Sequence, residues 1–366
     1  MEKYYLSVLQ NIMDIAGEPL KKLLDVFGSG ESIWMAREKE LAFAHVLQGN
    51  QLERFLAYRS SNKDLPYQVA TICQKKHISL CSIDDDEYPA LLREIDTPPY
   101  VLFYRGRLGN DLPRIAMVGS RKISPYGRAA AERFSVALAS RGFSVVSGGA
   151  YGVDTESHKG ALSVGITEAV MGCGVDIAYP PTNANLLAEI SETGAVISEY
   201  LPGTPPLKHN FPARNRIISG MSLGTLVVEA AERSGSLITA VCALEAGRDV
   251  FAVPASIFAC GSRGSNKLIQ QGAKLVLDSE DIISEYRDKI KLKTLSKKNG
   301  KMEKDFVLSK DEEKIFSLLT PDEPMSVDDI LYQLTEATPA RVSYHLLQME
   351  LRGLVQSDGA HRYVRK

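Results

Sequence analysis

Short runs of apolar, often β-branched residues alternate with amphipathic stretches between residues 114 and 278, and this alternation limits the possible folds. In the amphipathic stretches, such as 126–141, apolar residues recur every three or four positions and predict helices. Strands that are apolar along their whole length are typical of a parallel sheet with helices on both faces. We therefore predict a doubly wound α/β domain with a mostly parallel, Rossmann-like sheet over 111–288. The expected strands are 114–120, 143–149, 166–172, 195–200, 225–230, 249–254 and 274–278.

Two segments precede this domain. Residues 1–75 carry apolar residues at helical spacing and predict a small domain of short helices. Its turn VFGSGES resembles a helix-hairpin-helix, a fold that often contacts the DNA backbone, and a packing module with a tight turn is an equally good interpretation. Residues 76–110 predict two strands, 78–83 and 100–106, joined by an acidic stretch that contains prolines. We interpret 76–110 as a connector between domains.

A basic segment follows the α/β domain. Residues 287–305 hold eight lysines and arginines against three acidic residues and show no apolar periodicity. This composition predicts a solvated basic linker, whose bounds we set at 289–308.

The C-terminal residues 309–366 predict three helices and then a hairpin with Gly359 at its tip, which is the order of a winged helix. Ser326 and Thr338 are placed to cap the second and third helices. The third helix would offer Arg341, Ser343 and His345 to a duplex. Because this face is poor in arginine, docking to a protein is an equal alternative.

Bulk composition excludes several classes of protein. The formal net charge is -2, so any surface for a polyanion must be local. The five cysteines form no C-x-x-C pair, which fits neither a zinc site nor a disulfide framework. The chain shows no signal-peptide pattern and no apolar run of about 18 residues. We therefore expect a soluble, cytoplasmic protein with no membrane partner and no bound metal.

Glycine and other small residues gather where the predicted strands end. The loops are Gly119-Ser120-Arg121-Lys122, Ser147-Gly148-Gly149, Gly172-Cys173-Gly174 and Ser234-Gly235-Ser236. Ligands of open α/β sheets bind at this edge, and loops without large side chains bring backbone N–H groups close to an anion. The four loops together predict an anion site.

The common nucleotide motifs are absent from these loops. The first loop has one glycine before Arg121, the second strand ends at Ser147 instead of an acidic residue, and no G-x-x-x-x-G-K-[ST] occurs. NAD and a P-loop nucleotide are therefore disfavoured. Basic side chains replace them, with one aromatic ring among them: Arg121, Lys122, Lys208, His209, Phe211, Arg214 and Arg216. Cations that hold phosphates and a ring that stacks on a base suit single-stranded nucleic acid.

Two arrangements could instead indicate catalysis. Ser147, Asp154 and His158 would make a hydrolase trio, but no G-x-S-x-G elbow exists, and we interpret Asp154 as a carboxylate at a helix start that packs against His158. Glu229 ends the fifth strand of the domain. It could pair with Arg216 or Arg233, or it could act on a ribose.

Eight segments around these loops resemble the DprA (Smf) family of DNA-processing proteins. They are VGSRKISPYG, VVSGGAYGVDTESHKGAL, GCGVDIAYPPTN, ISEYLPGTPP, NFPARNRIISGMS, VVEAAERSGSLITA, GRDVFAVP and GSNKLIQQGAKLV. The resemblance covers the α/β domain in order and extends to a helical front similar to the family's sterile-alpha-motif-like domain and to a winged-helix tail. Two positions depart from the family pattern: Ser157 stands where alanine is usual, and Ala255 replaces a common glycine.

The resemblance implies a function without catalysis. Members bind single-stranded DNA during natural transformation, shield it from nucleases and help load the RecA recombinase onto it. By position, the family's DNA-binding pocket matches Gly119, Ser120 and Arg121 in the first loop, together with Lys208 and Phe211. Members also form homodimers, and the matching segment is LIQQGAKL, in which Ile269 and Leu275 would be contact residues. Neither the composition nor the resemblance points to a cofactor.

An enzyme is the alternative. The sheet is similar to that of nucleotide phosphoribohydrolases of the lysine-decarboxylase-like group, whose P-G-G-x-G-T-x-x-E motif partly matches SGMSLGTLVVE. Serine replaces proline, and three residues instead of two separate Thr225 from Glu229. We interpret the match as a shared fold.

Overall fold

The computed structural model describes residues 1–109, 112–287, 308–321, 323–334, 337–358 and 362–365. A nine-stranded sheet forms its centre, in the order β1-β2-β6-β5-β4-β3-β7-β8-β9. Neighbours from β6 to β9 pair in parallel, and β1 and β2 add an antiparallel edge. The strands are β1 (Ser79–Ser82), β2 (Val101–Gly106), β3 (Arg114–Val118), β4 (Ser144–Ser147), β5 (Thr167–Val170), β6 (Ala195–Ser198), β7 (Gly224–Val227), β8 (Asp249–Ala252) and β9 (Lys274–Leu275).

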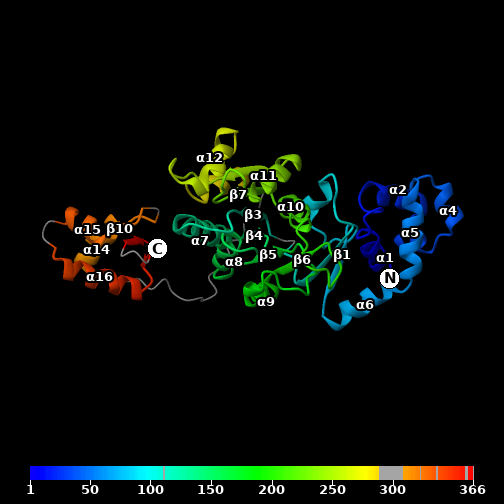
Figure 1. The fold of residues 1–366 in the computed structure, drawn as a ribbon, viewed down its shortest axis with the longest axis horizontal. Coiled ribbons are helices and arrows are strands. Elements are labelled where there is room, and N and C mark those ends of the chain that lie inside the picture. Colours follow the sequence, from blue (N-terminus) through cyan, green and yellow to red (C-terminus); the bar gives the residue numbers. More distant parts are fainter. Residues whose placement is uncertain (110–111, 288–307, 322, 335–336, 359–361, 366) are drawn as a thin grey trace.

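Helices cover both faces of this sheet, as Figure 1 shows. Alternate residues of β3 point to opposite faces: Ile115 packs with α7 and α8, and Ala116 packs with α10 and α11. Both sets are buried, which explains why the strands are apolar along their whole length. The helices are α7 (Pro125–Ser140), α8 (Val153–Leu162), α9 (Ala184–Thr193), α10 (Asn210–Gly220), α11 (Ser236–Glu245), α12 (Arg263–Gln270) and α13 (Glu280–Ile283).

The winding of the chain makes the sheet doubly wound. From β3 the chain moves outward through β4 and β5 to β6, then returns to the other side of β3 and continues through β7 and β8 to β9. The doubly wound, mostly parallel fold and its seven strands are confirmed. The strand order reverses between β3 and β7, and the loops at the carboxyl ends of the strands share one edge.

Residues 76–110 differ from our prediction of a connector. Their two strands are confirmed, but β2 pairs with β6 and β1 pairs with β2, so the segment belongs to the sheet. The stretch between them contains the 3-10 helix η1 (Ala90–Glu94), whose Leu92 lies in the same core cluster as α10. The prolines and acidic residues of this segment therefore indicate its turns, but they do not indicate that its strands are buried in the sheet.

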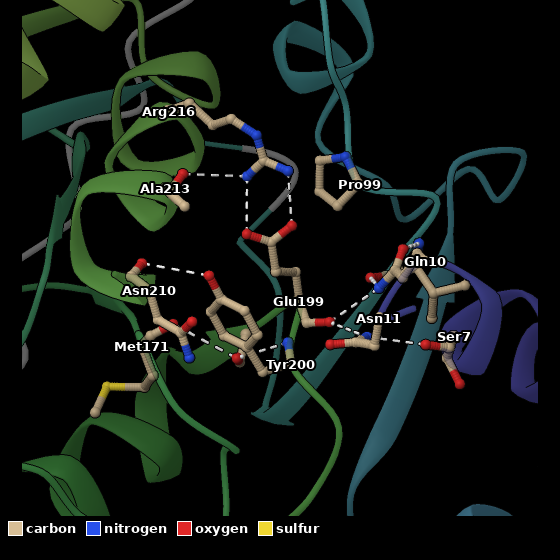
Figure 2. Close-up of polar contacts among 12 residues, drawn as sticks. Ser7, Gln10, Asn11, Pro99, Met171, Glu199, Tyr200, Asn210, Ala213 and Arg216 are labelled. Atoms are coloured by element: carbon tan, nitrogen blue, oxygen red, sulfur yellow. Dashed lines mark hydrogen bonds and ion pairs between the residues drawn. The ribbon is translucent and has the colours of Figure 1, made fainter. Parts of the chain in front are cut away.

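The helical front packs directly on this edge. It comprises α1 (Glu2–Leu9), α2 (Glu18–Phe27), α3 (Gly30–Met35), α4 (Glu38–Phe43), α5 (Asn50–Ser61) and α6 (Leu65–Lys75). Phe103 of β2 is fully buried in the core of these helices. Figure 2 shows Gln10 and Asn11 donating to the carbonyl of Glu199, and Gln10 also bonds both the N–H and the carbonyl of Val101. The helices and the sheet thus share one core.

The turn between α2 and α3 favours the packing interpretation of this helical front. Gly28 ends α2 in the left-handed conformation, and the Ser29 hydroxyl caps α3. The carboxylate of Glu2 accepts from the backbone N–H groups of Gly30 and Glu31 at 2.5 and 3.1 Å. These are the amides that a hairpin would offer to a DNA phosphate, and an acidic side chain of the chain already occupies them.

The C-terminal region is a winged helix. Its elements are α14 (Lys310–Leu318), β10 (Met325–Ser326), α15 (Val327–Gln333), α16 (Pro339–Leu351), β11 (Val355–Ser357) and β12 (Arg362–Arg365). The Ser326 side chain caps α15, and Thr338 is the N-cap of α16 without a side-chain bond. The predicted hairpin tip, Gly359, and nearly all of the basic linker lie outside the described residues.

The third helix of this region presents few cations. Arg341 pairs with Asp311 at 2.7 Å, and His345 lies beside Asp311 and Glu312. Ser343 and Tyr344 are exposed.

Of the helices in the described ranges, none has the length and apolar character needed to cross a bilayer.

The shared core gives a first prediction. Phe103→Ala should lower the free energy of unfolding by about 3–5 kcal/mol, because it leaves a cavity between β2 and the helices. Urea denaturation followed by circular dichroism measures the change. Phe43→Ala removes a ring that is 83% exposed and should change stability by less than about 0.5 kcal/mol. Equal stability of the two variants would contradict a common core.

Candidate functional site

The loop after β3 approaches its neighbours closely. A Cβ at Gly119 would lie 2.5 Å from Val153 Cγ2, so glycine is required for this packing. The Ser120 N–H donates to the Glu229 carbonyl at 2.7 Å, and the Ser120 hydroxyl accepts from the Lys122 N–H at 3.1 Å. These bonds fix the backbone and leave the Arg121 and Lys122 side chains exposed.

A pocket lies beside this loop at the carboxyl edge of the sheet. It is lined by Arg121, Gly148, Ala150, Tyr151, Met171, Gly172, Tyr179, Pro180 and Phe211. These residues come from the loops after β3, β4 and β5 and from the first turn of α10. A Cβ at Gly172 would lie 2.9 Å from the Phe211 ring, so the small residue makes room for the aromatic one. Three of the four glycine-rich loops predicted from the sequence therefore flank one cavity.

Aromatic rings and cations meet in this pocket. The rings of Phe211 and Tyr179 have centroids 5.3 Å apart. The Arg121 guanidinium lies 5.7 Å from the Phe211 ring centroid, within the range of a cation–π interaction. The structure thus brings Arg121 and Phe211 together although 90 positions separate them in the sequence. The predicted cation Lys208 is exposed, three residues before Phe211, next to the start of α10.

Arg214 lies beneath the pocket instead of facing it, which corrects its expected placement. Its side chain is 4% exposed, and it donates to the carbonyls of Gly148, at 2.9 Å, and Val170. The guanidinium also lies 6.0 Å from the Phe211 ring centroid. A cation committed to two buried carbonyls cannot reach a phosphate in the pocket, because breaking these bonds would leave buried groups unsatisfied.

Asp154 balances this buried charge. Its Oδ2 accepts from the N–H groups of Gly148 and Ala150, each at 3.2 Å. Burial raises the pKa of Asp154, and the charge of Arg214 and these hydrogen bonds oppose the rise. Burial likewise lowers the pKa of Arg214, and Asp154 opposes that shift. Arg214 therefore holds the 148–150 loop through the carbonyl of Gly148, and Asp154 holds it through the N–H groups of Gly148 and Ala150.

Arg216 is also engaged within the chain. Figure 2 shows both of its terminal nitrogens on the carboxylate of Glu199, at 2.9 and 2.6 Å. A paired Arg216 still reaches the surface, since a quarter of its side chain is exposed. Of the alternatives considered for Glu229, a pairing with Arg216 is therefore wrong, since Arg216 pairs with Glu199.

Glu229 stabilises the start of α7. Its Oε2 accepts from the N–H and the hydroxyl of Ser124, at 3.0 and 3.1 Å, and Ser124 caps the helix. A carboxylate at a helix N-terminus interacts favourably with the helix dipole. A Cβ at Gly261 would lie 2.8 Å from Oε1, so the loop after β8 closes over the other carboxylate oxygen. This environment gives Glu229 a structural role.

The hydrolase trio does not assemble. The Ser147 hydroxyl donates to the Met117 carbonyl at 2.6 Å, and the His158 Nδ1 lies 2.7 Å from the Thr167 hydroxyl. Because that hydroxyl donates to the Val145 carbonyl, the imidazole carries its proton on Nδ1. The polar partner of His158 is thus Thr167, and no hydrogen bond or ion pair joins it to Asp154 in the part of the chain that the structure describes. Throughout the described ranges, no three His, Cys, Asp or Glu side chains lie close enough to share a metal ion.

The remaining expected residues lie at the far edge of the sheet. Ile269 is half-buried on α12, and Leu275 is 42% exposed on the edge strand β9.

At Ala255, where the family pattern has glycine, the backbone does not adopt a positive φ, so alanine is accommodated. Ser157 is buried between α7 and α8.

Sequence reasoning missed five residues that line the pocket, namely Ala150, Tyr151, Met171, Tyr179 and Pro180. Tyr179 and Pro180 lie five and six positions after the loop 172–174, whereas Ala150, Tyr151 and Met171 lie within two positions of the loops 147–149 and 172–174. For Ala150, Tyr151 and Met171, that position is the signal that could have identified them.

Comparisons with known proteins agree with this arrangement. The family of DNA recombination-mediator protein A matches residues 79–287, and the DprA winged helix domain matches residues 303–360. Protein Smf of Synechocystis is 33% identical over 100% of this chain and 99% of its own length. The X-ray structure of DprA from Streptococcus pneumoniae is 36% identical with a TM-score of 0.63, covering 78% of this chain and 98% of its own. DNA processing protein A from Helicobacter pylori was solved for its single-stranded DNA binding mode. It is 27% identical with a TM-score of 0.53, and the match covers 58% of this chain and 97% of its own.

His158 gives the prediction of this subsection. Burial, with a further contribution from Arg214, lowers its pKa from 6.5 to about 3. Between these values the unfolded chain binds a proton that the folded chain does not, so stability falls as the pH falls. From about pH 5.5 to about pH 4.5, the wild type should lose about 1.4 kcal/mol more unfolding free energy than His158→Gln. Urea titrations measure this difference.

The matched control is His209→Gln at an exposed position. It should retain the wild-type loss of stability on acidification. If His158→Gln lost as much stability as the wild type, the imidazole would already be protonated in the folded state.

Proposed function

Because the chain belongs to the family of DNA recombination-mediator protein A, we propose that it binds single-stranded DNA as a recombination mediator. The observation that carries the proposal is the pocket in which Arg121 and the Phe211 ring lie together at the carboxyl edge of the sheet. Arginine can hold a phosphate while an aromatic ring stacks on a base, whatever the base is. Sequence-tolerant binding of this kind suits a protein that must accept any strand.

The site residues divide into two groups by their surroundings. Arg121, Lys122 and Lys208 are exposed and would contact the DNA backbone, with Phe211 as the stacking ring and Gly119 and Ser120 shaping the loop. Arg214 and Arg216 act as positioning residues, since each is engaged with groups of the chain. Phosphate contacts made by the first group fix the strand without reading its sequence.

The finer function rests on the family. We infer that the protein shields incoming DNA and helps load RecA during natural transformation, acting in the cytoplasm as a homodimer. The relatives from Streptococcus pneumoniae and Bacillus subtilis carry the name DNA processing protein DprA. We further infer that it binds without turnover. The commitment of Glu229 to the α7 cap and of His158 to Thr167 supports binding over hydrolysis.

Arg121→Glu tests the binding site. The variant should weaken binding to single-stranded oligonucleotides of every sequence by at least about tenfold, because it replaces a phosphate-binding cation with a repelling charge. For the wild type, the logarithm of affinity should fall with the logarithm of salt at about −0.7 per phosphate contact. Fluorescence anisotropy at several salt concentrations measures both effects.

The control for this test is Arg105→Glu. Arg105 is exposed on β2 and pairs with the start of β6, at the opposite edge of the sheet from the pocket. It should bind as the wild type does. Full affinity in Arg121→Glu, or an affinity independent of salt, would remove the basis of the proposed site.

The homodimer is tested separately. The double variant Ile269→Glu, Leu275→Glu should be monomeric by light scattering, because it places charges on the edge formed by α12 and β9. Its cooperativity in DNA binding should fall in parallel. Leu347→Glu changes an equally exposed leucine on α16 and should leave the mass unchanged. An unaltered dimer in the double variant would place the interface elsewhere.

A further inference from the structure

The loop after β8 exposes two large apolar side chains. In residues 253–262, Ile257 is 76% exposed and Phe258 is 86% exposed. Single exposed apolar residues are ordinary, but a neighbouring pair on a loop at the ligand-binding edge of the sheet requires an explanation. Neither residue belongs to the pocket of Arg121 and Phe211.

The base of this loop is held firmly. Asn266 bonds both the N–H and the carbonyl of Ala255, at 3.0 and 2.9 Å, and the Tyr126 hydroxyl donates to the Pro254 carbonyl at 2.6 Å. On the other side of the loop, the N–H of Gly264 donates to the Ala230 carbonyl at 2.7 Å. The loop is therefore anchored to α7, α12 and the loop after β7, and its exposed tip has a defined position.

This loop continues the edge that contains the pocket. The pocket uses the loops after β5, β4 and β3, and the next two strands in the sheet are β7 and β8. Glu229 links the loop after β3 to the loop after β8. It accepts from Ser124 beside the first loop and lies against Gly261 in the second. A strand of DNA that leaves the pocket at Arg121 in this direction would pass the loops after β7 and β8, and the second of these loops carries Phe258.

Cations lie along the same route. Lys122, Arg233 and Arg263 are exposed, and none of them forms an ion pair with a described residue. Lys267 is also exposed, although it lies 3.7 Å from Glu232. Exposed cations in the loops after β3 and β7 and at the start of α12, together with the exposed ring in the loop after β8, match the chemistry of a single-strand binding track.

We propose that the single strand held in the pocket continues along this edge and stacks a second base on Phe258, with Arg233 and Arg263 holding the intervening phosphates. The inference rests on the proposed function, and it assigns a second stacking platform to that function. It predicts that the β8 loop contributes only when the strand is long enough to reach it.

Oligonucleotide length separates the two platforms. Binding of oligothymidylate of about 5 and about 20 nucleotides to the full-length protein is measured by anisotropy. Phe258→Ala should weaken the long strand at least about fivefold, the effect of one lost base stack, and leave the short strand unchanged. Phe258→Tyr should restore binding, whereas Phe258→Leu should not, because only a ring can stack. An 86% exposed side chain can be replaced without loss of folding.

Two controls keep the outcomes distinct. Arg121→Glu should weaken both lengths, so a failure of the proposed function would appear as binding unaffected by Arg121→Glu, whatever Phe258 does. Phe43→Ala, an equally exposed ring on α4, should change neither length.

A direct contact is tested by photo-crosslinking with 5-iodouracil placed along the long strand. A crosslink to Phe258 supports the proposal. Long-strand binding that is unchanged in Phe258→Ala, or restored by Phe258→Leu, would overturn it. A monomeric mass of Phe258→Ala by light scattering would also overturn it, since the ring would then be an interface between copies of the chain.

Discussion

Two buried side chains of opposite charge, Asp154 and Arg214, hold the loop on which the functional edge depends. Arg214 bonds the carbonyls of Gly148 and Val170, and Asp154 accepts from the N–H groups of Gly148 and Ala150. Neither charge could be buried alone, because an unpaired charge costs several kcal/mol, on the order of 3–5 when one partner of a buried pair is removed. The same guanidinium lies over the Phe211 ring. One buried cation thereby positions both the glycine loop and the aromatic ring of the pocket.

The sequence was sufficient to predict the α/β domain because its signals are local. A strand that is buried on both faces must be apolar throughout, and the seven such runs between 114 and 278 all became strands of one sheet. The convergence of Arg121 with Phe211 followed from the rule that strand-end loops share an edge. Residues 76–110 were misjudged because the pairing of β2 with β6 joins segments about 90 positions apart. Prolines and acidic residues reveal turns, but they do not reveal which strand lies beside another.

The roles of the arginines in α10 could not be predicted. Two positions apart on a helix corresponds to roughly 200° of rotation, so Arg214 and Arg216 necessarily point to different sides. Arg214 is the buried one, and the charge that opposes the effect of its burial comes from Asp154, 60 positions away in the sequence. Composition identified a cluster of cations, and only the packing separates those that bind carbonyls and carboxylates of the chain from those that remain exposed. Glu229 is a similar case, since its Oε2 accepts from the N–H and the hydroxyl of Ser124 in another loop.

The bonds that Gln10 and Asn11 make to β2 and to the segment after β6 have a mechanical consequence. The helical front and the sheet share apolar side chains as well as these amides, so a shift of one against the other would break buried contacts. These contacts fix the orientation of the helices relative to the sheet. A protein bound to the helices would therefore also be held in a fixed orientation relative to the pocket.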